Sequence, residues 1–148
     1  MKTSEAMVVV EGDIDGSVTR LWHALTDAQV MRQWFFDNIP DFKPEVGFTT
    51  EFMVDAGERQ FLHQWEVTEV KAPAKLAYRW TFAGYAGASQ SVFELSGNES
   101  SSHLRISIPV EEDFPDDVPE FTRESCLGGW EYMLDQIQKH FAKSDDLA

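Results

Sequence analysis

Between Phe48 and Val110, mostly apolar residues recur at every second position in five runs that are separated by short breaks. The runs are Phe48–Val54, Phe61–Val67, Leu76–Phe82, Ser91–Leu95 and Leu104–Val110. The breaks carry glycine or proline, such as Gly57, Pro73 and Gly97, and these residues are typical of turns. A period of two places alternate side chains on opposite faces of a strand, and short connections join antiparallel strands. The pattern therefore predicts an antiparallel meander with one buried and one solvated face.

On either side of these runs the period becomes helical. Val18 to Leu25 and Val30 to Phe35 each place their apolar residues on one helix face, which predicts two short helices. Thr26-x-x-Gln29 has the spacing of a capping box for the second helix. A longer stripe at spacings of three and four predicts a long amphipathic helix near the end of the chain; it contains Leu127, Trp130, Leu134, Ile137 and Phe141.

The remaining segments complete the order of elements. The valine-rich run Ala6–Val10 predicts a first strand, ahead of the two short helices. Residues 37–47 and the acidic stretch 111–120 each contain two prolines and are expected to be loops. Residues 142–148 are expected to fray. No repeat and no long linker divides the chain, so we expect one domain over residues 1–148.

An antiparallel sheet with one apolar face must be covered, and only the last predicted helix is long enough to lie along it. The expected fold is therefore α+β. It is a helix-grip fold in which a curved antiparallel sheet of about six strands wraps around the long C-terminal helix, with two short helices between the first and second strands. The space between such a sheet and its helix is a natural place for a ligand.

Charge and cysteine content exclude several classes of partner. Lys and Arg number 12 against 26 Asp and Glu, a net charge of −14, which argues against duplex DNA or RNA and against anionic membranes. No run approaches the roughly 18 apolar residues of a membrane span, and no signal peptide is recognisable. Cys126 is the single cysteine, so no disulfide can form within the chain, and we expect a reduced, cytoplasmic protein.

Four segments carry a resemblance to a known family. They are Val18-x-x-Leu21-Trp22-x-Ala24-Leu25-Thr26-Asp27 followed by Trp34, then Pro44-x-x-Gly47-Phe48, then Glu69-Val70-x-x-Pro73-x-x-Leu76-x-Tyr78-x-Trp80, and finally Gly129-Trp130-x-x-Met133-Leu134. In this order they resemble the heat-shock-protein-ninety ATPase activator homologues of the START-like (SRPBCC) superfamily. The resemblance implies the helix-grip fold and an internal cavity. It implies little about chemistry, because that superfamily includes carriers, lipid binders, cyclases and co-chaperone domains.

Two positions depart from the family pattern. Trp65 stands where many relatives carry glycine, so its indole would fill space that relatives leave open, and whether it fills the cavity is left open here. Ser91 stands where relatives often have a branched apolar residue, which predicts a small polar notch.

The inward faces of the predicted strands and the last helix supply the candidate binding residues. The ligand-binding set is Phe52, His63, Trp65, Tyr78, Trp80, Phe93, Phe121 and Trp130. Aromatic walls favour an apolar, elongated or ring-shaped small molecule, neutral or with one weakly polar end. His63 and Tyr78 would orient that end, although a hydrogen-bonded core histidine is the simpler interpretation of His63, and core packing explains Tyr78 equally well.

The sequence identifies no catalytic, metal or cofactor site. No two of the four histidines have metal-ligand spacing, and neither a Cys-x-x-Cys motif nor a phosphate-binding glycine loop is present. Two alternatives to simple binding stay open. One is a cyclase or hydrolase that uses His63 and Tyr78 as an acid–base pair, and the other is a stress-response module that contacts a chaperone. A homodimer is also left open.

Overall fold

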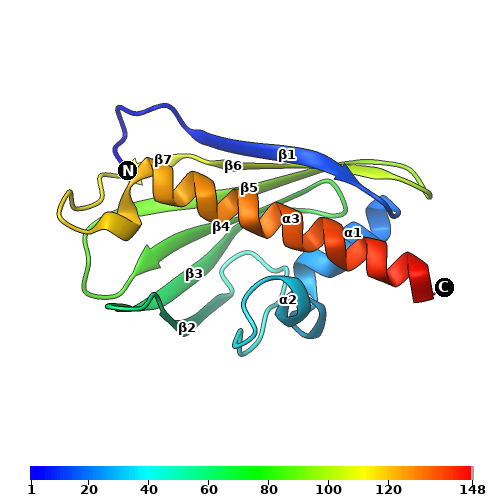
Figure 1. Ribbon diagram of the computed structural model, residues 1–148, viewed down its shortest axis with the longest axis horizontal. Helices are drawn as coiled ribbons and strands as arrows, with labels where there is room; N and C mark the ends of the chain where they lie inside the picture. Colours follow the sequence, from blue (N-terminus) through cyan, green and yellow to red (C-terminus); the bar gives the residue numbers. More distant parts are fainter. Residues whose placement is uncertain (148) are drawn as a thin grey trace.

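The computed structural model describes the backbone of residues 1–147 and the side chains of residues 1–142. Its elements follow one another as β1 (Val8–Ile14), α1 (Val18–Thr26), α2 (Ala28–Trp34), β2 (Thr49–Asp55), β3 (Gln60–Lys71), β4 (Lys75–Phe82), β5 (Ala88–Gly97), β6 (Ser102–Ile108), β7 (Val110–Glu112), the 3-10 turn η1 (Pro119–Phe121) and α3 (Arg123–Leu147). In Figure 1, α3 runs along one face of the curved sheet, and α1 and α2 lie together near one end of it.

All strands belong to one antiparallel sheet in the order β1-β6-β5-β4-β3-β2, with β7 paired to β5. Strands β2 to β6 form the predicted meander. β1 returns to the far edge beside β6, where Val8 pairs with Ile108 and Ile14 with Ser102. The sheet, the long C-terminal helix and the two short helices confirm the predicted α+β, START-like fold.

Two predicted boundaries are wrong. β1 begins at Val8 rather than Ala6 and continues past Gly12, because its whole length pairs with β6. The expected loop 111–120 contains the end of β7 and the start of η1. Pro109 has no N–H to continue the ladder of β6, but its carbonyl accepts a hydrogen bond from the N–H of Gln90 at 2.9 Å, and the chain then pairs with β5.

The capping box proposed for α2 is also wrong. Asp27, not Thr26, is the N-cap, and its Oδ1 accepts hydrogen bonds from the backbone N–H groups of Gln29 at 2.9 Å and Val30 at 3.3 Å. The Thr26 hydroxyl instead donates to the carbonyl of Trp22 at 2.8 Å, inside the last turn of α1. Asp27 adopts the extended backbone conformation that a cap requires, whereas Thr26 is still helical.

The core lies between the sheet and the three helices. Trp130, Ile137 and Phe141 are buried on α3, and Leu127 and Leu134 are half-buried beside them. A second, smaller cluster of buried residues closes the end of the sheet next to the start of α3; it contains Phe61, Phe114, Val118 and Phe121. The helix is continuous to Leu147, and residue 148 lies outside the described part of the chain, so fraying of residues 142–148 stays a prediction.

Two adjacent glycines, Gly128 and Gly129, occupy the interior of α3. Glycine in a helix interior costs about 1 kcal/mol relative to alanine, because it loses more backbone freedom on folding.

Within residues 1–147, no helix combines the length and the apolarity that crossing a membrane would need.

Candidate functional site

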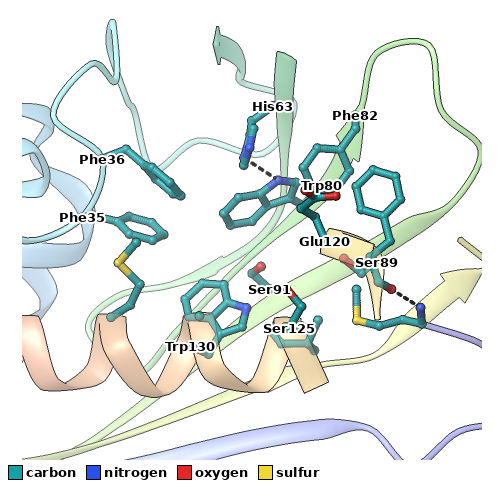
Figure 2. A pocket seen from close by; sticks show the side chains of 16 residues that line it. Phe35, Phe36, His63, Trp80, Phe82, Ser89, Ser91, Glu120, Ser125 and Trp130 are labelled. Atoms are coloured by element: carbon teal, nitrogen blue, oxygen red, sulfur yellow. Dashed lines mark hydrogen bonds between the residues drawn. The ribbon is translucent and has the colours of Figure 1, made fainter. Parts of the chain in front are cut away.

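A pocket of about 190 Å³ lies between the inner face of the sheet and the N-terminal half of α3. Figure 2 shows side chains converging on it from β3, β4, β5, the segment after α2 and α3. Most of its surface is apolar, and its lining includes the aromatic side chains of Phe35, Phe36, Trp80, Phe82, Phe121 and Trp130. Such a lining gives contact area to an apolar molecule and few polar groups to bind a charged one.

The aromatic walls of the pocket are positioned by the register between β3 and β4 and by the end of α2. Residues directly paired across antiparallel strands point to the same face, and β3 and β4 pair His63 with Phe82 and Trp65 with Trp80. Trp80 meets Trp130 of α3 edge-to-face, with ring centroids 5.8 Å apart. Phe35 caps the C-terminal end of α2, and its ring lies 5.7 Å from the ring of Trp130.

His63 is the main polar group of the sheet wall and is 8% exposed. Its Nδ1 accepts a hydrogen bond from the indole N–H of Trp80 at 3.1 Å (Figure 2). Burial lowers the pKa of His63 to about 4, so the ring is neutral at pH 7. Because Nδ1 is the acceptor, the proton of the neutral ring is on Nε2. His63 is thus a hydrogen-bonded core residue that also lines the pocket, and its contact with a ligand stays a prediction.

Ser91 gives the pocket a second polar atom. The residue is 1% exposed, and its Oγ is one of two buried side-chain polar atoms without a hydrogen-bond partner among the described residues. The other, Trp65 Nε1, belongs to a residue that does not line this pocket. A buried hydroxyl without a partner costs about 1–3 kcal/mol, so its position beside the pocket favours a partner that arrives from outside the chain.

The other titratable groups that line the pocket are the Cys126 thiol, the Glu120 carboxylate and the N-terminal ammonium of Met1, which donates a hydrogen bond to the carbonyl of Phe121. Burial raises the pKa of the Cys126 thiol to about 11, which keeps it protonated at pH 7. The carboxylate of Glu120, at the rim, is bound by Arg59 Nη1 at 3.2 Å. Among the described residues, no group of three His, Cys, Asp or Glu side chains is placed to hold a metal ion.

Four of the eight candidate residues line the pocket, namely His63, Trp80, Phe121 and Trp130. The other four, Phe52, Trp65, Tyr78 and Phe93, are buried in the adjoining core. Trp65 packs between Phe35 and Tyr78, with ring centroids 5.6 Å and 4.6 Å away, so its indole occupies core volume behind the pocket wall.

The proposed acid–base pair is not assembled. Tyr78 pairs with Val67 on β3, whereas His63 lies four residues earlier on that strand, opposite Phe82. At 3.2–3.4 Å per residue the two side chains are separated by roughly 13 Å along the sheet. Burial raises the pKa of Tyr78 well above its ordinary value, which disfavours its ionised form further.

Sequence reasoning missed several pocket residues. Phe35 and Phe36 face the pocket because the chain leaves α2 at that point, and Ser89, Ser125 and Gly129 complete its polar and open edges. Two adjacent aromatic residues ahead of a proline-containing loop are a usable signal of such a position. The helical period alone predicts that Phe35 belongs to the packed face of the second helix.

Comparison with known proteins identifies the family of this chain. The family model described as "Activator of Hsp90 ATPase homolog 1-like protein" matches residues 15–142. The chain belongs to this family. The predicted resemblance is thereby confirmed, although no protein in the curated set matches significantly.

Solved structures of relatives share the fold of this family member. Protein MLL2253 from Mesorhizobium loti is 27% identical, with a TM-score of 0.74 over 90% of this chain and 95% of that one. Protein CV1439 from Chromobacterium violaceum is 19% identical, with a TM-score of 0.74 over 91% and 96% of the two chains. The Aha1 dimer from Colwellia psychrerythraea is 18% identical, with a TM-score of 0.70 over 93% and 96%.

Proposed function

We propose that this protein is a binding protein for a compact, neutral, ring-shaped molecule that carries one hydrogen-bond acceptor. The observation that carries the proposal is the hydroxyl of Ser91, which is buried beside an aromatic pocket and has no partner among the described residues. A carbonyl or ring nitrogen of the ligand would supply that partner. The Nε2–H of His63 is a second donor on the same wall.

The volume of the pocket limits the size of the ligand. An apolar protein cavity of about 150 Å³ is known to hold one benzene ring, and this pocket measures about 190 Å³. It therefore suits one or two fused rings rather than a long acyl chain. Burial of the ring surface contributes affinity at about 25 cal/mol per Å², and the polar atoms determine orientation.

Two probes of the same shape test the proposal. 2-Tetralone and tetralin are fused two-ring molecules that differ in one carbonyl, and both are titrated while tryptophan emission is followed. We expect 2-tetralone to bind more tightly, since a net hydrogen bond of about 1 kcal/mol corresponds to about fivefold in affinity. Ser91→Ala should weaken the binding of 2-tetralone and leave the binding of tetralin unchanged.

Ser107→Ala is the matched control. Ser107 is another buried serine, on β6, that does not line the pocket. Its variant should bind both probes as the wild type does. The proposal is wrong if neither probe perturbs the emission at about millimolar concentration, which corresponds to about −4 kcal/mol, or if the two serine variants behave alike.

The family membership supports a second candidate, contact with a chaperone. The description of the matching family names an activator of the Hsp90 ATPase, and the solved structure of the Colwellia relative is a dimer. The purified chain would then raise the ATPase rate of purified Hsp90. Sedimentation at several concentrations would test the homodimer. A cytoplasmic location agrees with both candidates.

A further inference from the structure

One stripe of α3 forms the helix wall of the pocket. Ser125, Gly129 and Met133 are spaced four residues apart, so they lie above one another on one helix face, and all three line the pocket. Gly129 is the position on this stripe that has no side chain. A Cβ added to it would meet no atom within 4 Å, so the space beside it is open.

Neither packing nor backbone geometry requires glycine at this position. Cβ atoms added at Gly16 or Gly87 would approach a phenylalanine ring to 2.5 Å and 2.4 Å, which explains those two glycines. Gly129 has no such neighbour, and its φ is negative, as in an ordinary helix. The helix thus carries the conformational cost of glycine without a compensating contact inside the chain.

We propose that Gly129 is the residue that determines the size of the ligand. Its missing side chain leaves room for the second ring of a flat, two-ring neutral ligand, which would lie against the bare backbone of α3. Figure 2 shows α3, with Ser125 and Trp130, across the pocket from the sheet wall that carries His63. This inference rests on the proposed binding function. The unpartnered hydroxyl of Ser91 points independently to a ligand in the same pocket.

The neighbouring glycine provides an internal control. A Cβ at Gly128 would also meet no atom within 4 Å, but Gly128 does not line the pocket. Both glycines are exposed, but one residue along a helix turns by about 100°, which places Gly128 beside Glu124 and Tyr132 and away from the pocket lining. The same substitution at the two positions therefore changes the helix equally and changes the pocket at one position alone.

The experiment compares Gly129→Leu with Gly128→Leu, using 2-tetralone as the two-ring probe and cyclohexanone as the one-ring probe. Gly129→Leu should bind 2-tetralone at least about tenfold more weakly, as expected when bulk is added to a pocket that fits its ligand. Its affinity for cyclohexanone should stay close to that of the wild type. Gly128→Leu should bind both probes like the wild type. Both variants should melt at a higher temperature, because leucine is a better helix former than glycine.

The outcomes separate the two proposals. If the wild type binds neither probe, the binding function itself is wrong. If the wild type binds 2-tetralone and Gly129→Leu binds it equally well, or Gly128→Leu loses the same affinity, the role of Gly129 is wrong. Gly129→Ala against Gly128→Ala repeats the comparison with the smallest side chain, in case either leucine variant does not fold, and should give the same ranking with a smaller loss.

Discussion

At the scale of single residues, the pocket depends on polar groups in an apolar setting. His63 accepts the hydrogen bond from Trp80 at Nδ1, which leaves the proton of the neutral ring on Nε2, and the residue lines the pocket. Alternation along β3 predicted that His63 faces inward, because a period of two assigns faces without any knowledge of the tertiary structure. The partner of Nδ1 could not be predicted, since it depends on the register between β3 and β4.

The lowered pKa of His63 predicts a pH dependence of stability. In the unfolded chain the ring has its ordinary pKa of 6.5, and in the folded chain a pKa of about 4. The unfolded state therefore binds more protons between these values, and the free energy of unfolding falls as the pH is lowered through this window. The loss that His63 causes is expected to reach about 3 kcal/mol by pH 4, at 1.36 kcal/mol per pKa unit.

Urea denaturation of wild type and His63→Asn from pH 7 to pH 4 measures this effect. Asparagine offers an oxygen near the position of Nδ1, so it can still accept from Trp80, but it does not titrate. As the pH falls, the free energy of unfolding should decrease more for the wild type than for His63→Asn. His103 is present in both proteins, so its titration cancels; its pKa is raised chiefly by the hydrogen bond that its ring donates to the carboxylate of Asp13. Parallel pH profiles would contradict the assignment.

At the scale of elements, the local sequence pattern predicts most strands and helices correctly, but it predicts poorly which elements pair and pack with one another. The five alternating runs became β2 to β6 because each buries one face on the same core. β7 depends on Pro109 interrupting β6 next to a free stretch of β5, and β1 depends on a partner more than 80 residues away. Such long-range pairings leave little local signal. Phe35 and Phe36 line the pocket through similar long-range packing, and no alternating strand pattern predicts it.

The junction between α1 and α2 gives a prediction at this scale. Asp27→Ala should destabilise the protein by about 1 kcal/mol, because it removes the acceptor for two N–H groups at the start of α2. Thr26→Ala should cost less, since its hydroxyl bonds only to the carbonyl of Trp22, which already lies within a helix. Thermal unfolding of the two variants compares the two sites. An equal or larger loss for Thr26→Ala would restore the capping box that the spacing suggested.

At the scale of the whole molecule, an apolar pocket is set in a strongly acidic protein. A net charge of −14 over 148 residues produces a negative field around the molecule. Glu120 adds a carboxylate at the rim of the pocket, although Arg59 partly neutralises it. The field acts at long range on any approaching ion, whereas the pocket acts at contact on shape and hydrogen bonding. We therefore expect the negative field to disfavour anionic ligands as they approach, and the pocket to select among the remaining ligands by shape and hydrogen bonding.

Naphthalene-2-carboxylate, an anionic two-ring molecule, tests this selection against neutral 2-tetralone. At about 0.01 M ionic strength, where the Debye length is about 30 Å, the anion should bind at least about tenfold more weakly than the ketone. At about 1 M, where that length is about 3 Å, the gap should shrink while the affinity for the ketone changes little. Glu120→Gln should strengthen binding of the anion alone, because it removes the carboxylate at the rim and leaves Arg59 without that partner. Equal affinities for the two probes at low salt would mean that the acidic surface plays no part in selecting the ligand.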